Sequence, residues 1–325
     1  MTPLPEPAIS HRNGPTFSVI IPCWNSADTL SETLDSVLSQ CFSDWEMIIV
    51  NDASTDNSTA IIGSFAERDP RIKSINLIQS GPSRSRNFGA LECARGKYLA
   101  FLDADDLWHP NKLSIIRNAF IRAPDLDGIY AKVAFFRNNP AFPETVSKIY
   151  PAELKPLDIL RDNPVCTMSN LVLKTSCFKK FGGFNPDIRH NEDIELLVRM
   201  IASGVRIAGL EDVLVFYRTS LSGLSANLNS MRTGWRLALQ SLQSTDMKLT
   251  KQQLAEAEAG NLRYLARRAL RTDAPRFEAL KLSLAGISKS PKSFFSPVWR
   301  GAMTLAGALL APVMTKKLRN ISFSR

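Results

Sequence analysis

The sequence lacks the features that mark several protein classes. It contains no Gly-x-Gly-x-x-Gly run, which disfavours a dinucleotide-dependent oxidoreductase, and it shows no internal repeat. Its five cysteines are odd in number and scattered without metal-ligand spacing, so we expect reduced cysteines in a cytoplasmic protein. The N-terminus carries several prolines but no apolar core segment, and no signal peptide is expected.

Positive charge, in contrast, is abundant at one end of the chain. Residues 232–325 hold 17 Lys and Arg against 5 Asp and Glu, a net charge of +12, whereas residues 1–231 hold 23 against 26, a net charge of −3. This asymmetry indicates an anionic partner for the C-terminal part, either a membrane or a nucleic acid. We expect a disordered lead-in over residues 1–15, a folded domain over 16–225 and a basic helical region over 226–325.

Buried strands alternate with helices in the first hundred residues, which predicts an α/β fold with a parallel sheet and right-handed crossovers. The expected strands are residues 17–21, 46–50, 72–78 and 98–102. Further along, the pattern predicts a strand at 128–133, an irregular stretch to about residue 164, a strand at 169–174, a helix at 193–203 and closing strands at 206–210 and 214–218.

Three carboxylates, Asp103, Asp105 and Asp106, follow the strand at 98–102. They fit either a solvated turn, with Asp106 as a helix cap, or a site for a cation or ligand. Trp24 and Asp52 follow two other strands, so in a parallel sheet they share the same rim. An aromatic face, a hydrogen-bond acceptor and a carboxylate pair together favour a nucleoside-diphosphate site with Mg²⁺ or Mn²⁺.

Five ordered motifs resemble glycosyltransferase family 2 over about residues 16–220. They are Ser18-Val19-Ile20-Ile21-Pro22-Cys23-Trp24-Asn25, Asn51-Asp52-Ala53-Ser54-Thr55-Asp56, Gly81-Pro82-Ser83 with Arg86-Asn87, Asp103-Ala104-Asp105-Asp106, and Gly182-Gly183-Phe184 followed by Glu192-Asp193. The resemblance implies a GT-A fold, a Rossmann-like mixed and mainly parallel sheet flanked by helices. It also implies inverting transfer of a sugar from a nucleotide-diphosphate donor.

The resemblance also implies roles for individual residues. The segment from Pro22 through Trp24 to Asn25 would line the nucleotide, Asp52 would meet the base, and Asp103 would approach the ribose. On the diphosphate side, Arg86 would assist donor binding and Asp105 would hold a divalent metal, Mg²⁺ or Mn²⁺.

On the acceptor side, Asp193 would be the general base, although a carboxylate at a helix start also fits a cap. Trp108 and Phe184 are candidate platforms for sugar stacking, and Gly183 and Glu192 belong to the same side. Family members often carry a histidine after the last strand's Tyr-Arg; the segment after Tyr217-Arg218 has none, which leaves open whether metal is strictly required.

The segment from Ser293 to Thr315 carries a single charge, Arg300, and is followed by the basic cluster Lys316-Lys317-Leu318-Arg319. It is rich in small residues and contains two prolines, so lying in a membrane interface is favoured over spanning. The alternative is that these helices pack on the core with their basic residues facing water.

These observations predict an inverting glycosyltransferase of surface polysaccharide synthesis. It would use a nucleotide-sugar donor and a glycan or lipid-linked acceptor, and no nucleic acid. The expected location is cytoplasmic and peripheral on the inner face of the cell membrane, at an anionic surface. The alternatives are a sugar-nucleotide pyrophosphorylase and a non-catalytic carbohydrate- or nucleotide-binding protein.

Overall fold

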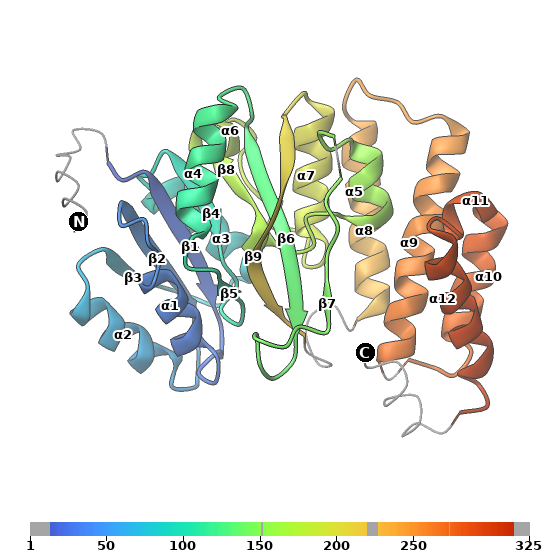
Figure 1. Ribbon diagram of the computed structural model, residues 1–325, viewed down its shortest axis with the longest axis horizontal. Coiled ribbons are helices and arrows are strands. Elements are labelled where there is room, and N and C mark those ends of the chain that lie inside the picture. The colour runs from blue at the N-terminus through green and yellow to red at the C-terminus, as the bar shows by residue number, and fades with distance from the viewer. Residues whose placement is uncertain (1–13, 151, 220–226, 273, 315–325) are drawn as a thin grey trace, which may run out of the picture.

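A curved mixed sheet forms the centre of the molecule, with helices on both faces and a helical bundle beyond one end (Figure 1). The computed structural model describes residues 14–150, 152–219, 227–272 and 274–314. Within these residues the sheet has the strand order β3-β2-β1-β4-β8-β6-β9-β5, and β7 pairs with β6.

The strands of the sheet are β1 (Phe17–Cys23), β2 (Trp45–Asp52), β3 (Ile72–Leu77), β4 (Tyr98–Phe101), β5 (Leu107–Trp108), β6 (Gly128–Phe136), β7 (Thr145–Val146), β8 (Val172–Lys174) and β9 (Ile207–Arg218). The helices before residue 220 are α1 (Leu30–Leu38), α2 (Ser58–Arg68), α3 (Pro82–Asn87) with the π-helix η1 (Phe88–Cys93), α4 (Lys112–Arg122), α5 (Pro156–Asp162), the 3₁₀-helix η2 (Met168–Asn170), α6 (Thr175–Lys180) and α7 (Glu192–Ala202). The C-terminal helices are α8 (Leu228–Gln243), α9 (Lys251–Arg271), α10 (Glu278–Lys289), α11 (Pro291–Phe294) and α12 (Val298–Leu310).

The predicted parallel sheet is confirmed for the first four of these strands. β1 pairs in parallel with both β2 and β4, and β2 pairs in parallel with β3. The chain therefore moves outward from β1 to β3 and then returns to the other side of β1. α/β sheets bind ligands in the crevice at such a reversal, which here falls at the carboxyl ends of β1 and β4.

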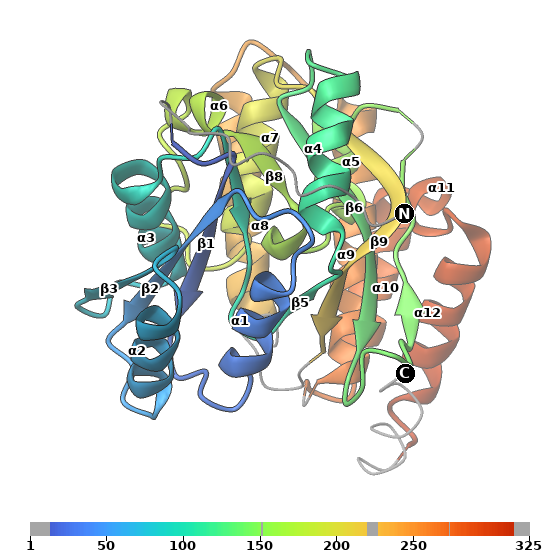
Figure 2. The same cartoon turned by 60° about the vertical axis from the view of Figure 1, so that its left-hand side comes forward.

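Side-chain alternation along the strands builds one apolar core on each face of the sheet. Ile20 and Phe101 point to the face covered by η1, α6 and α7, whereas Val19 and Ala100 point to the face covered by α1, α2 and α4. Figure 2 shows these helix layers on either side of the strands. The central strands β1, β2 and β4 are therefore buried on both faces.

Two expectations for the second half of the sheet are corrected. The stretch before residue 164 is not irregular throughout, because it contains β7 and α5. The two closing strands are one strand, β9, whose pairing with β6 shifts register near Lys132. Such a bulge interrupts the period-2 pattern, which made one strand resemble two.

The C-terminal helices form their own core, in which α9 packs against α10, α11, α12 and also α5. Arg263 of α9 is 1% exposed, and its Nη2 donates to Asp162 Oδ1 over 2.7 Å while its Nη1 donates to the carbonyls of Ser293 and Phe294. The alternative interpretation, in which the basic residues of these helices face water, therefore does not hold for Arg263.

In the part of the chain that the structure describes, no helix is long and apolar enough to cross a membrane. The basic cluster Lys316-Lys317-Leu318-Arg319 and most of the predicted lead-in lie outside the described residues, as does the expected domain boundary near residue 225. The proposed domain limits therefore stay predictions.

Candidate functional site

Two loops at the carboxyl ends of β1 and β2 are tied together around an exposed indole. Asn25 has a φ of +48°, a conformation that Asn tolerates, and its Oδ1 accepts a hydrogen bond from the Thr55 backbone N–H at 2.7 Å. Trp24 is 54% exposed, whereas Pro22 is half-buried within β1. The first loop thus presents an exposed aromatic side chain at the carboxyl end of β1, and its contact with a nucleotide stays a prediction.

Asp52, at the end of β2, is buried and holds the loop that precedes α3. Its Oδ1 accepts hydrogen bonds from the Ser80 N–H at 2.7 Å and the Ser80 hydroxyl at 2.9 Å, and its Oδ2 accepts one from the Gly81 N–H at 2.7 Å. The carboxylate therefore fixes the neighbouring loop. Contact with a base stays a prediction.

The three carboxylates after β4 have different environments. Asp103 is partly exposed, and its backbone N–H donates to Ser169 Oγ. The side chain of Asp105 is exposed, yet the surrounding protein partly removes water from its carboxylate. This desolvation, followed by the Asp103 charge, raises the pKa of Asp105 to about 6. Asp106 is fully buried; burial and the charges of Asp105 and Asp103 raise its pKa well above the usual range.

Asp106 is not the helix cap that one interpretation of the acidic turn proposed. Asn111 occupies the N-cap position of α4. Asp106 accepts hydrogen bonds from the Ser169 hydroxyl at 2.5 Å and from the Arg218 backbone N–H at 3.0 Å. It therefore joins the acidic turn to η2 and to the end of β9.

Arg86 links the acidic turn to the start of α7. The guanidinium is buried, with Nη2 2.6 Å from Asp103 Oδ1 and Nη1 2.9 Å from Glu192 Oε1. Burial is the largest single influence on the pKa of Arg86 and lowers it. The two carboxylates together outweigh burial, so the pKa is raised above its usual value. Arg86 thus brings Asp103 and Glu192, 89 positions apart in the sequence, to one charged cluster.

Asp193 follows Glu192 in the first turn of α7 and is half-buried. Its Oδ2 accepts a hydrogen bond from Asn163 Nδ2 at 3.0 Å. Burial, and then the neighbouring Glu192 carboxylate, raises the pKa of Asp193 to about 7. A carboxyl with that pKa exchanges a proton near neutral pH, which suits a general base.

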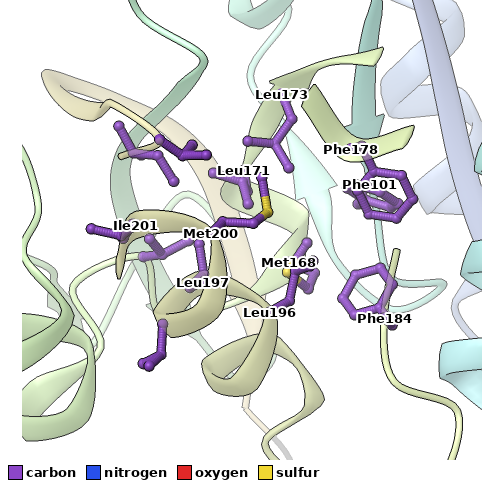
Figure 3. Packing of buried hydrophobic residues seen from close by; sticks show 14 of the residues in the cluster. Phe101, Met168, Leu171, Leu173, Phe178, Phe184, Leu196, Leu197, Met200 and Ile201 are labelled. Atoms are coloured by element: carbon purple, nitrogen blue, oxygen red, sulfur yellow. The ribbon is translucent and has the colours of Figure 1, made fainter. Parts of the chain in front are cut away.

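Three residues assigned to the acceptor side are core residues instead. Trp108 is 3% exposed and its Nε1 donates to the Ser169 carbonyl at 2.8 Å. Phe184 packs against Phe101 and Phe178, as Figure 3 shows, so neither ring is available to stack on a sugar. Gly183 is also buried, with a φ of +76° and its carbonyl bound by Arg199.

A divalent metal fits this crevice only if a ligand supplies most of the coordination. Within the described residues, no group of three His, Cys, Asp or Glu side chains is placed to hold a metal ion. The Asp103 carboxylate already binds Arg86 and Thr167, whereas the Asp105 carboxylate is exposed. Desolvation and the Asp103 charge raise the pKa of Asp105, and a bound cation would counter both effects and stabilise the charged form. Mg²⁺ is commonly bound in this way, by one or two carboxylates and substrate phosphates.

The structure also brings residues to the site that no sequence pattern indicated. Asn163 has a φ of +36°. Within the described residues, it donates the one side-chain hydrogen bond that Asp193 accepts. Arg218 Nε donates to the Asp105 carbonyl at 3.0 Å and its Nη2 pairs with Glu32. Such contacts between distant segments leave no local signal. Only the Tyr-Arg of the last strand could have pointed to Arg218.

The mixed, mostly parallel sheet flanked by helices has the architecture of GT-A glycosyltransferases. Residues 18–182 match Glycosyl transferase family 2, and the chain belongs to that family. It is a glycosyltransferase, which decides against the pyrophosphorylase and against the non-catalytic binding protein.

Two relatives and two solved structures are similar to the chain. TuaG of Bacillus subtilis, a candidate glycosyltransferase of teichuronic acid biosynthesis, is 30% identical over 225 residues, 66% of this chain and 82% of TuaG. WfgD of Escherichia coli, a UDP-Glc:α-D-GlcNAc-diphosphoundecaprenol β-1,3-glucosyltransferase, is 34% identical over 123 residues, 38% of this chain and 47% of WfgD.

Both structures share the fold at low sequence identity. Residues 1–349 of S. aureus TarS match with a TM-score of 0.62 and 20% identity, covering 95% of this chain and 91% of that one. The mannosyltransferase PcManGT of Pyrobaculum calidifontis, in complex with GDP-Man and Mn²⁺, matches with a TM-score of 0.58 and 18% identity, covering 93% and 88%.

Replacing Arg86 with Met should destabilise the protein strongly. The change leaves the Asp103 and Glu192 carboxylates without their shared cation in a poorly hydrated crevice, and breaking such a pair costs roughly 3–5 kcal/mol. Urea unfolding at neutral pH measures the loss. Arg84→Met, at an exposed position of the same helix, is the matched control and should change stability by at most about 0.5 kcal/mol. Equal stability of the two variants would contradict the linking role of Arg86.

Proposed function

We propose that the protein is an inverting glycosyltransferase that moves a sugar from a nucleotide-diphosphate donor to a hydroxyl of a glycan or lipid-linked acceptor, in surface polysaccharide synthesis. The observation that carries the proposal is the charged cluster in which Arg86 joins the acidic turn to the helix bearing Asp193. The two ion pairs hold the acidic turn close to the start of α7, which carries Asp193. The names of TuaG and WfgD support the polysaccharide and lipid-linked context.

The reaction is a single displacement at the anomeric carbon. Asp193 accepts the proton of the acceptor hydroxyl while that oxygen bonds to the anomeric carbon, and the bond to the donor phosphate breaks with its electron pair on the leaving nucleoside diphosphate. Asn163 donates to Asp193 Oδ2 and so orients the carboxyl group. Trp24 is available to stack on the nucleotide, and Asn25 and Asp52 hold the loops around it.

Asp105 is the residue that would hold Mg²⁺ or Mn²⁺ in this site. A metal bound there would neutralise charge on the diphosphate. PcManGT, which shares the fold, was solved with GDP-Man and Mn²⁺, and this supports the proposal.

Asp193→Asn should lower turnover by roughly 10²–10⁴-fold while leaving donor binding nearly intact, since the amide cannot accept the proton. In the unsubstituted protein, kcat/KM should rise with pH to a plateau with a midpoint near 7, because Asp193, whose pKa is raised to about 7, acts only when deprotonated. Asp187→Asn, in the exposed loop before α7, is the control. Wild-type turnover in Asp193→Asn would exclude this residue as the base.

Asp105→Ala should remove the dependence of nucleotide affinity on Mn²⁺. Calorimetry with UDP and with GDP, each in Mn²⁺ and in EDTA, measures this; in the wild type, Mn²⁺ should tighten binding of the preferred nucleotide by about tenfold or more. The exposed carboxylate of Asp28 provides the control variant Asp28→Ala. An unchanged Mn²⁺ effect in Asp105→Ala would refute the assignment of the metal to this residue.

Association with the cytoplasmic face of an anionic membrane is a further part of the proposal. In α12 the small residues are buried against the bundle, whereas the large apolar residues face outward. The exposed set is Val298, Trp299, Met303, Leu309 and Leu310, with Val313 just beyond the helix, at 55–81% exposure. This is the reverse of an ordinary surface helix, and an apolar face with a basic surrounding suits the interface of anionic lipid.

Replacing Trp299, Met303 and Leu310 together with Ser should weaken binding to vesicles of phosphatidylglycerol and phosphatidylethanolamine by at least about tenfold, because their apolar area no longer enters the lipid. Cosedimentation measures the binding. Ile121→Ser with Phe142→Ser, two exposed apolar residues elsewhere, is the control pair. Point variants are preferable to truncation at Ser293, whose carbonyl binds Arg263 in the core of the bundle. Undiminished cosedimentation would rule out α12 as the contact.

A further inference from the structure

One buried arginine joins the C-terminal bundle to α5. Arg263 of α9 is 1% exposed, and its Nη2 lies 2.7 Å from Asp162 Oδ1, at the end of α5. Its Nη1 donates to the carbonyl oxygens of Ser293 at 3.2 Å and Phe294 at 3.0 Å, and also to that of Ser296. Because a guanidinium presents its donors in a rigid fork, these bonds fix the end of α5 against the segment that leads from α10 to α12.

The two helices that Arg263 and Asp162 belong to are packed backbone to backbone. A Cβ atom at Gly260, in the turn of α9 before Arg263, would lie 2.9 Å from the carbonyl oxygen of Arg161. Arg300 of α12 adds a second guanidinium 3.9 Å from the Asp162 carboxylate. Replacing a buried ion pair by apolar residues is often neutral for stability, so stability alone does not account for an arginine here.

Asn163 follows Asp162 directly and touches the proposed catalytic carboxyl. It caps α5 in the left-handed conformation, with a φ of +36°, and its backbone N–H donates to the Ile159 carbonyl at 3.2 Å. Its Nδ2 donates to Asp193 Oδ2 at 3.0 Å. Its Oδ1 is buried and has no hydrogen-bond partner within the described residues. No second bond therefore holds the amide, and the position of Nδ2 follows that of the end of α5.

We propose that Arg263 is a positioning residue for the Asp193 carboxyl and acts on it through Asp162 and Asn163. The inference rests on the proposed function, in which Asp193 accepts the proton of the acceptor hydroxyl. A misplacement of about 1 Å at a reacting group can cost roughly 10²-fold in rate, so a fixed end of α5 matters for this step. The C-terminal bundle thereby takes part in the reaction, besides the lipid contact proposed for α12.

The hydrogen bond from Asn163 has an effect of known sign on Asp193. Burial, and then the Glu192 charge, raises the pKa of Asp193 to about 7, whereas the bond from Asn163 lowers it. Loss of that bond should therefore raise the pKa of Asp193 further, because the bond stabilises the charged form. The titratable groups electrostatically linked to Asp193 are Glu192, Arg86, Cys166 and Tyr264, and the variants below retain all of them.

The test compares the full-length wild type with Arg263→Lys, Asn163→Gly and the double variant. Arg263→Lys keeps the positive charge but loses the fork, and Asn163→Gly removes the amide while glycine accepts the left-handed backbone. Carbon-13 NMR titration of the Asp193 carboxyl, assigned with Asp193→Asn, should give a higher pKa in each single variant than in the wild type. The double variant should match Asn163→Gly, since Arg263 acts through Asn163.

Turnover should change in the same order. With UDP-Glc and UDP-GlcNAc as probes, hydrolysis at pH 7, in which water replaces the acceptor hydroxyl, should be roughly tenfold or more slower in each single variant. Calorimetric affinity for UDP in EDTA should stay at the wild-type value. Lys289→Gln is the matched control, because it breaks the 2.6 Å ion pair with Glu258 between α9 and α10 of the same bundle. It should leave both the pKa of Asp193 and hydrolysis unchanged.

An unchanged pKa of Asp193 in Arg263→Lys would overturn the positioning role, and so would a double variant whose shift is the sum of the two single shifts. Loss of UDP affinity in Arg263→Lys would contradict it as well, because the effect would not be confined to Asp193. If Arg263→Lys does not fold, Asp162→Glu, which keeps the charge and displaces the carboxylate, takes its place with the same expected result. Wild-type turnover in Asp193→Asn together with the expected pKa shifts would refute the proposed function and leave the link from Arg263 to Asp193 standing.

Discussion

The ion-pair network around Arg86 is the interaction on which the site depends. The parallel half of the sheet ends in the acidic turn, and α7 belongs to the later half of the chain. Arg86 is bound to a carboxylate of each, Asp103 and Glu192. A buried guanidinium keeps its charge, and its two ion pairs hold both carboxylates in place. Asp193, one residue beyond Glu192, takes its position from the same constraint.

The parallel half of the fold could be predicted from sequence because its signals are local. β1, β2 and β4 are buried on both faces and are largely apolar. The positions of Trp24 and Asp105 in the fold could be predicted for the same reason, since Trp24 directly follows β1 and Asp105 lies in the turn after β4.

What the sequence could not provide is decided by contacts between distant segments. Trp108 and Phe184 are aromatic residues beside motifs, and only the packing of η2, α6 and β4 shows that their rings are core. Asp106 looked like a cap because nothing local indicates its bonds to Ser169 and Arg218. The roles of Arg263 and Asn163 depend likewise on partners 30 or more positions away.

The packing of α9 has a consequence for reach. This helix contacts α5, which is followed by Asn163, the hydrogen-bond partner of Asp193, and also α12, which turns its large apolar residues outward. A protein resting on α12 would hold its crevice at a set height above the bilayer, at least one helix diameter, about 10 Å. The height of the site would then limit which acceptors can react. In an acceptor anchored in lipid, only hydroxyls whose distance from the anchor matches that height would reach the site. The length of the acceptor, as well as the identity of its sugar, would then determine whether it reacts. The protein and the acceptor would meet by diffusion along the membrane surface.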